Sequence, residues 1–257
     1  MEIYYTLMTF IFGAVLGSFY NVVGYRLPKG ESLISPPSHC PNCNHRLGAS
    51  ELVPIFSYIF LGGKCKNCKK KISMFYPIFE LISGMLFAIS YLRFNFTIDF
   101  GIAITFISML LIIIISDYQT MIIPDSVLIV SSIILLIELT IKNGISNIGV
   151  SIIDALIPFL VMLLLKKFGD FIFKKESMGG GDIKLMAVLG LVLGYEIAIV
   201  SIFLASFIGL PVSLYILKKN KSHIIPFGPF LAVSAIILLF LQIDFNNIIS
   251  YLTIYDI

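Results

Sequence analysis

The sequence predicts an all-α polytopic membrane protein of about eight transmembrane helices, with a small polar loop domain after the first of them. The chain of 257 residues is 58% hydrophobic and only 13% charged, whereas soluble domains average about 25% charged residues. Its apolar residues also come in long blocks, each close to the length that a helix needs to cross a bilayer. These two observations exclude a soluble globule with one large core.

Each apolar block predicts one membrane span. The division between the sixth and seventh spans depends on Gly194, Tyr195 and Glu196, and one long kinked helix there would reduce the count to about seven. The first block follows Glu2 with no preceding lysine or arginine, so we expect a retained helix rather than a cleaved signal peptide. The predicted spans are residues 3–23, 76–92, 98–116, 126–141, 147–166, 183–197, 198–217 and 226–243.

The basic residues orient these spans, because cytoplasmic loops of membrane proteins are enriched in lysine and arginine. With eight spans, all of the 18 lysine and arginine residues except Arg93 and Lys142 fall on one side. Seven spans would move the basic segment 218–221 to the other side. We therefore expect eight spans, a cytoplasmic loop 24–75 and both termini outside. The net charge of +3 is expected to meet anionic lipid head groups, and it gives no indication of nucleic-acid binding.

The loop 24–75 holds all four cysteines, in the two Cys-x-x-Cys knuckles HCPNC at 39–43 and KCKNC at 64–68. Two such knuckles can complete a tetrahedral sulfur site, which is the zinc-ribbon pattern. Two disulfides are the alternative, but the reducing cytosol disfavours them. His39 and His45 flank the first knuckle and are expected to be surface residues rather than ligands. We therefore expect a structural zinc held by Cys40, Cys43, Cys65 and Cys68.

Carboxylates inside apolar blocks are costly to bury and therefore indicate pairing or function. Glu138 and Asp154 lie in plain apolar runs, where we expect hydrogen bonds within the bundle. Asp117 ends the run MLLIIIISDYQTMIIPD, whose proline predicts a short connector at 118–123. Asp182 begins a later apolar run, directly after the three glycines of MGGGDIK. The predicted topology places Asp117 and Asp182 at the cytoplasmic ends of their spans, at similar depth.

Two such carboxylates can share one proton, so that one acts as a base and the other as an acid. This is the arrangement with which aspartic proteases activate water against a peptide bond. Gly179, Gly180 and Gly181 would let the backbone approach a substrate chain closely. The alternative is a flexible loop in which Asp182 is only a helix N-cap.

Taken together, the motifs resemble a known family. GGGD is an instance of the GxGD signature of membrane aspartyl proteases. With the two cysteine knuckles, five segments follow the order of bacterial type IV prepilin peptidases over about residues 12–194. These segments are GSFYNVVGYRLP at 17–28, ELVPIFSY at 51–58, YPIFELISG at 76–84, SDYQTMIIPD at 116–125 and GGGDIKLMAVLGLVLG at 179–194.

The resemblance implies an enzyme of the bacterial cytoplasmic membrane that cuts the leader from prepilins and pseudopilins at the cytoplasmic face. Most such enzymes cut after a glycine and then methylate the new N-terminus with S-adenosylmethionine. Asp117 and Asp182 match the catalytic aspartates, and Gly179 and Gly181 match the GxGD glycines. The four cysteines match an N-terminal domain tied to methyl transfer. This implies a first helix at 1–23, a metal-binding domain at 24–75 and a peptidase domain at 76–257.

Several alternatives remain beside this expectation. Glu80 lies just inside the second span, where it could bind a basic substrate group or the sulfonium of S-adenosylmethionine, or pair with Arg26. The chain has no glycine-rich nucleotide fingerprint, so methyl transfer rests on the resemblance alone and a peptidase without it is one alternative. A small transporter or a scaffold with a zinc-ribbon loop is another, although no internal repeat supports a transporter. The sequence gives no indication of an oligomeric state.

Overall fold

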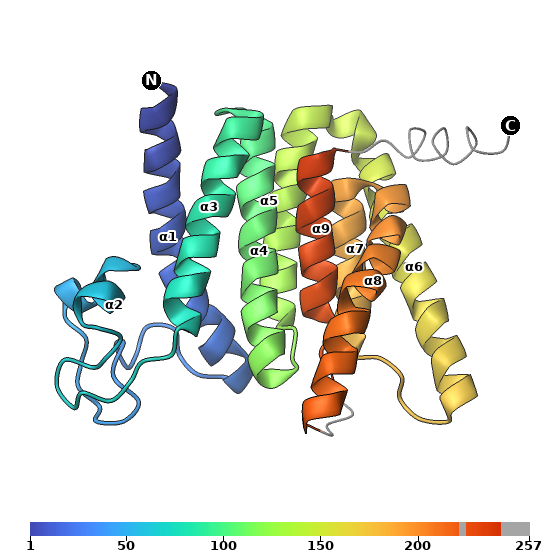
Figure 1. Cartoon of the computed structure of the whole chain (residues 1–257). Coiled ribbons are helices and arrows are strands. Elements are labelled where there is room, and N and C mark those ends of the chain that lie inside the picture. Colours follow the sequence, from blue (N-terminus) through green and yellow to red (C-terminus); the bar gives the residue numbers. More distant parts are fainter. Residues whose placement is uncertain (221–224, 243–257) are drawn as a thin grey trace, which may run out of the picture. The chain divides into compact units, whose positions relative to one another are not determined.

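A computed structural model describes residues 1–220 and 225–242 of the chain (Figure 1). The regular structure in these residues is helical, as predicted, and they form no strand beyond two isolated β-bridges. The chain divides into two compact units, Met1–Phe100 and Gly101–Ile257. Lys221 and the C-terminus, whose side of the membrane the sequence predicts, lie outside the described residues.

The first unit is built on two long helices. α1 (Glu2–Arg26) is followed by the short 3-10 helix η1 (Leu27–Lys29) and by the cysteine loop, which contains η2 (Ala49–Glu51) and α2 (Phe56–Phe60). α3 (Phe75–Phe94) then packs along α1.

Small residues let α1 and α3 approach closely. A Cβ on Gly13 would lie 2.7 Å from the Cβ of Phe87, and a Cβ on Gly17 would lie 2.8 Å from that of Ser83. The Ser83 hydroxyl also donates a hydrogen bond to the Gly13 carbonyl at 2.7 Å. Glycines four residues apart and a serine hydrogen bond between helices are typical of contacts inside membranes, where close packing replaces the hydrophobic effect.

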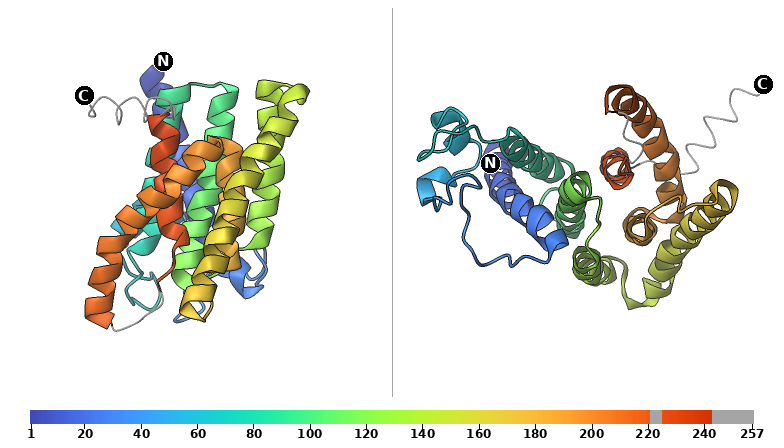
Figure 2. Two further views of the ribbon diagram at one scale, coloured as in Figure 1. Left: turned by 90° about the vertical axis from the view of Figure 1, so that its right-hand side faces the viewer. Right: turned by 90° about the horizontal axis from the view of Figure 1, so that it is seen from below.

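The second unit holds most of α4 and the remaining helices. α7 lies among its neighbours, in contact with α5, α6, α8 and α9 (Figure 2), and Leu185, Met186 and Leu189 on it are fully buried. The helices are α4 (Ile98–Thr120), α5 (Asp125–Asn143), η3 (Ile145–Asn147), α6 (Ile148–Phe173), α7 (Gly180–Leu193), α8 (Tyr195–Asn220) and α9 (Gly228–Leu241).

Each of the eight predicted spans overlaps a helix among the described residues, although the span 183–197 crosses the break at Gly194, and not all of these helices are full spans by length and composition. Five segments of the described residues are long and apolar enough to cross a bilayer, so the chain is a multi-pass membrane protein. α7 has 14 residues and is therefore about 21 Å long, less than the hydrocarbon thickness of about 30 Å. The count of eight stays a prediction. The five are Glu2–Lys29, Phe75–Phe94, Ile98–Thr120, Ile145–Phe173 and Tyr195–Ile216.

Two predicted boundaries can be compared with the structure. The predicted connector at 118–123 is too long, because α4 continues to Thr120, whose hydroxyl donates to the Ser116 carbonyl at 2.8 Å. The chain turns only at Met121, which has a φ of 56°. The break between α7 and α8 is where the sequence places it, because Gly194 adopts a φ of 81° that disfavours other residues.

The contact between α6 and α7 generates a prediction about stability. A Cβ on Gly190 of α7 would overlap the backbone carbonyl of Asp154 and lie 2.8 Å from Cγ of Pro158 in α6. Gly190→Ala should therefore lower the stability by about 1–3 kcal/mol. Gly149→Ala in α6 is the matched control, because its Cβ would meet nothing within 4 Å. Thermal unfolding in detergent measures both variants, and equal midpoints would contradict the predicted backbone contact.

Candidate functional site

The two cysteine knuckles adopt the same local structure. In the first, the Asn44 N–H donates to the Cys40 carbonyl at 2.9 Å, and in the second the Lys69 N–H donates to the Cys65 carbonyl at 3.0 Å. Asn44 and Lys69 both take a positive φ, 55° and 58°. Each knuckle therefore turns its two thiols towards one side.

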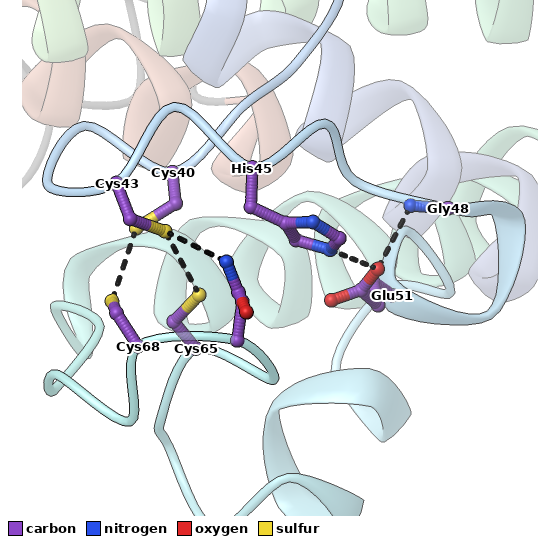
Figure 3. A network of polar contacts seen from close by, with 8 residues as sticks. Cys40, Cys43, His45, Gly48, Glu51, Cys65 and Cys68 are labelled. Carbon is purple, nitrogen blue, oxygen red and sulfur yellow. Dashed lines mark hydrogen bonds and ion pairs between the residues drawn. The ribbon is translucent and has the colours of Figure 1, made fainter.

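The four thiols meet in one cluster (Figure 3). Their sulfur atoms all lie within 4.8 Å of one another, with Cys40 and Cys68 at 3.8 Å and Cys43 and Cys65 at 3.9 Å. A tetrahedron of Zn–S bonds of about 2.3 Å has sulfur–sulfur edges of about 3.8 Å. All four cysteines are free thiols. The donor set and its spacing therefore fit a tetrahedral metal ion better than two disulfides.

The electrostatics of the cluster also favour a cation. The backbone N–H of Asn42 is the main cause that lowers the pKa of the Cys40 thiol to about 7. The N–H of Cys68 likewise lowers the pKa of Cys65. At Cys68 the Lys70 N–H lowers the pKa, but burial and the neighbouring thiols outweigh it and raise the pKa to about 11. The Cys68 thiol thus resists ionisation beside the other thiols, and a bound divalent ion would offset that resistance.

The two histidines beside the first knuckle contact residues other than the cysteines. His45 Nε2 lies 3.2 Å from Glu51 Oε2, which also accepts the Gly48 N–H at 2.9 Å (Figure 3). The hydrogen bond from the Gly48 N–H is the main cause that lowers the pKa of Glu51. Burial opposes this shift, and the contact with His45 adds to it. His39 Nδ1 lies 2.9 Å from the Pro37 carbonyl. Neither histidine joins the described cysteine cluster, in agreement with the expectation from sequence.

Glu80 links the cysteine loop to the long helices of the first unit. Its buried Oε2 accepts the Ile55 N–H at 2.7 Å, and it also hydrogen-bonds to the Ser18 side chain of α1. Arg26, the partner considered from sequence, instead donates to the Ser32 carbonyl at 3.0 Å. These contacts give Glu80 a positioning role, while its contact with a substrate or with S-adenosylmethionine stays a prediction.

Asp117 and Asp182 lie in the second unit and are both buried, with 5% and 9% of their surface exposed. Asp117 lies in the last turn of α4 and Asp182 in the first turn of α7. The N-cap of α7 is Gly179 rather than Asp182. The alternative in which Asp182 is only a cap is therefore wrong, because the helix begins at Gly180 and the carboxyl already lies inside it.

Three segments meet around these two aspartates. A Cβ on Gly181 would lie 2.8 Å from Cβ of Ile123, in the turn after α4. A Cβ on Gly228, at the start of α9, would lie 2.6 Å from Oδ2 of Asp117 and 3.2 Å from Cδ1 of Ile123. The Asp117 carboxyl is also close enough to act on Asp182 by a Coulombic interaction. The close approach at Gly181, Ile123 and Gly228 therefore brings both carboxyls into one region.

Gly228 is a site residue that the sequence pattern did not reveal. Its backbone is a hydrogen-bond donor to the Asp117 carboxyl, and donors at a helix N-terminus suit a carboxylate. Pro229 follows it near the start of α9, a position where proline is favoured. The segment PFGPF at 226–230 was the available signal, but one sequence does not show that it faces Asp117.

The three glycines before Asp182 are not equivalent. A Cβ on Gly180 would meet nothing within 4 Å, and one on Gly179 would lie 3.6 Å from Asp182 Oδ2, an ordinary contact. Only Gly181 is required by close packing. Oδ1 of Asp182 is buried with no hydrogen-bond partner among the described residues. An unpartnered buried oxygen beside a second carboxyl is suited to bind a reacting polar group.

Comparisons with known proteins identify the family of the chain. The model of the bacterial peptidase A24 N-terminal domain matches residues 11–94, and that of the type IV leader peptidase family matches residues 104–214. The chain belongs to the type IV leader peptidase family. It is therefore an enzyme of a protease family. The N-terminal match contains Glu80 and the four cysteines, the other contains both aspartates, and Gly228 lies beyond either.

Two curated relatives extend the comparison to most of the chain. A prepilin leader peptidase/N-methyltransferase of Bacillus subtilis is 35% identical over 231 residues, which cover 89% of this chain and 91% of the relative. A second prepilin leader peptidase/N-methyltransferase, from Pseudomonas aeruginosa, is 31% identical over an alignment of 263 residues that covers 90% of this chain and 88% of the relative. No solved structure matches this chain significantly.

Proposed function

We propose that the protein removes the leader from type IV prepilins and pseudopilins with the aspartate pair Asp117 and Asp182, and then methylates the new N-terminus. The family and the printed names of the relatives support the substrate and both activities. The observation that carries the proposal is the close approach of Gly181, Ile123 and Gly228, which holds both buried carboxyls in one region.

In the proposed hydrolysis, the two carboxyls share one proton. The ionised carboxylate takes a proton from water, whose oxygen forms the new bond to the scissile carbonyl carbon. The protonated carboxyl donates its proton to the carbonyl oxygen. When the C–N bond breaks, the first carboxyl gives the proton it took from water to the leaving nitrogen, and a hydroxyl of the intermediate returns a proton to the second carboxylate, which restores the pair. The Gly228 backbone donor orients the Asp117 carboxyl, and Oδ1 of Asp182, which has no hydrogen-bond partner among the described residues, is left to bind the reacting water. The active-site loop expected at Gly179 and Gly181 is the start of a helix, with Gly179 as the N-cap of α7 and Gly181 in its first turn, and both would lie beside the substrate chain.

The proposed organisation follows the membrane helices. Eight passes with both termini outside would place the knuckles and both aspartates at the cytoplasmic face of the bacterial cytoplasmic membrane. Residues 1–23 would form the first helix, 24–75 the metal-binding domain and 76–257 the peptidase domain. Cys40, Cys43, Cys65 and Cys68 would hold a structural zinc. S-adenosylmethionine would supply the methyl group for the new N-terminal amine.

Cleavage of a synthetic prepilin tests the aspartate pair. Asp117→Asn and Asp182→Asn should each lower the cleavage rate by about 100-fold or more, because neither amide can exchange the proton. Intact-mass spectrometry with S-adenosylmethionine follows leader loss and the added methyl group separately. Both variants should still methylate a pre-cleaved pilin.

Other outcomes have definite meanings. Leader loss without methylation by the wild type would leave a peptidase alone. Full cleavage by folded asparagine variants would exclude the aspartate mechanism, and an uncut substrate with folded wild type would favour a scaffold or transporter.

The glycines around the pair give a sharper geometric prediction. Gly181→Ala and Gly228→Ala should lower the cleavage rate by about tenfold to 100-fold, because an added methyl group displaces Ile123 or Asp117. Gly180→Ala is the matched control from the same motif, since its methyl group would enter open space. The measurement is the cleavage rate of each variant on the same synthetic prepilin. Equal rates in all three variants would mean that these contacts do not set the catalytic geometry.

The metal site predicts a stoichiometry. The purified protein should carry about one zinc per chain, and Cys65→Ser should lose it because three thiolates and a hydroxyl bind zinc weakly. His39→Ala should keep the metal, since that ring contacts the Pro37 carbonyl. Elemental analysis by mass spectrometry measures both. Zinc retained in Cys65→Ser, or lost in His39→Ala, would contradict the four-cysteine assignment.

A further inference from the structure

The short helix α2 and the residues before it expose a group of large apolar side chains, here called the α2 apolar face. Phe60 is 83% exposed, Ile59 63% and Phe56 58%. The rings of Phe56 and Phe60 stack with centroids 6.4 Å apart. A surface of this kind, on a loop rich in lysine, needs a partner that covers it. Its members are Leu52, Val53, Phe56, Ile59 and Phe60.

The opposite side of α2 is fixed to the cysteine loop. The Tyr58 hydroxyl donates to the Ile72 carbonyl at 3.3 Å, and a Cβ on Gly63 would lie 2.8 Å from the same hydroxyl oxygen. Tyr58 therefore points inwards while Phe56, Ile59 and Phe60 point outwards. Rotating the helix to bury the apolar face would break the Tyr58 contact, so the exposure is built into the domain.

Glu80 sets the height of α2 along the helix α3. The Ile55 N–H, directly before α2, donates to Glu80 Oε2 at 2.7 Å. Glu80 lies five residues after Phe75, where the membrane-spanning α3 begins, and thus about 7.5 Å along that helix. Figure 1 accordingly shows α2 level with the lower turns of α3 rather than below them. The α2 apolar face is thereby held beside a membrane-spanning segment.

We propose that the α2 apolar face inserts into the lipid bilayer at the boundary between head groups and acyl chains, and anchors the cysteine domain to the membrane. Apolar helix faces bury about 5–10 Å into this boundary, which matches the depth that Glu80 imposes. The first turns of α3 also expose apolar side chains, since Tyr76, Ile78 and Leu81 are 40%, 45% and 40% exposed.

The positive charge of the segment after α2 also favours the lipid bilayer as the partner of the α2 apolar face. The sequence after α2 carries five lysines within a few residues, and cations next to an inserted apolar face attract anionic head groups. The lysines are Lys64, Lys66, Lys69, Lys70 and Lys71. An apolar substrate helix or a second copy of the chain would satisfy the apolar face but would not account for its depth beside α3.

The absence of tryptophan from the chain makes a direct test possible. Phe60→Trp places a single reporter on the α2 apolar face of the full-length protein, in vesicles of phosphatidylcholine and phosphatidylglycerol. Pro41→Trp, at the polar tip of the first knuckle, is the aqueous control, and Phe12→Trp on the exposed side of α1 is the membrane control. Zinc content and thermal midpoint verify the fold of each variant.

If the α2 apolar face is anchored in the bilayer, the fluorescence emission of Phe60→Trp should be blue-shifted. Lipids brominated near the head group should quench this emission more strongly than lipids brominated deep in the acyl chains. Iodide in the buffer should quench the Pro41→Trp variant and spare Phe60→Trp. Emission that iodide quenches and brominated lipids leave unchanged would overturn the proposal. So would protection that appears only with added prepilin, or that depends on protein density in the vesicle, because a substrate or a second copy would then cover the face. Ile59→Trp repeats the test at a second position.

Discussion

The arrangement of the second unit depends on one close approach of backbones. Gly181 at the start of α7 and Gly228 at the start of α9 both lie against Ile123, in the turn after α4. None of the three helices alone can place two carboxyls together. Their ends can do so only because two of the contacting residues have no side chain, so that Asp117 and Asp182 are enclosed with little exposed surface. A carboxyl pair of this kind can share a proton and activate water.

Helix packing elsewhere in the second unit holds α7 in the position that this contact requires. α7 is too short to act as an independent membrane anchor, and its position is set by the helices around it, above all by the backbone contact of Gly190 with α6. In the first unit, Gly13 and Gly17 allow the equally close pairing of α1 and α3. In both units, small residues at contacts between helices allow close packing, because lipid offers no hydrophobic gain for packing helices together.

Much of this structure could be predicted from the sequence, and the exceptions have physical reasons. Apolar blocks locate helices well, because the bilayer enforces the length and composition of each block. The four-cysteine cluster could be predicted because its ligand spacing is local within each knuckle. The role of Gly228 could not, since it arises from a contact between segments distant in the chain. The end of α4 was misplaced because the helix continues past Asp117 until Met121 turns the chain.

The most direct measurement of the central claim is a cross-link between positions 117 and 182. The double variant Asp117→Cys/Asp182→Cys, treated in membranes with a short bifunctional methanethiosulfonate, should form an intramolecular link that peptide mass mapping identifies. Asp117→Cys/Asp154→Cys is the control, because Asp154 contacts Gly190 near the other end of α7, and each single variant controls for the four knuckle cysteines. A link confined to the first pair is the predicted result. A folded double variant that forms no such link, or links equally in both pairs, would contradict the account.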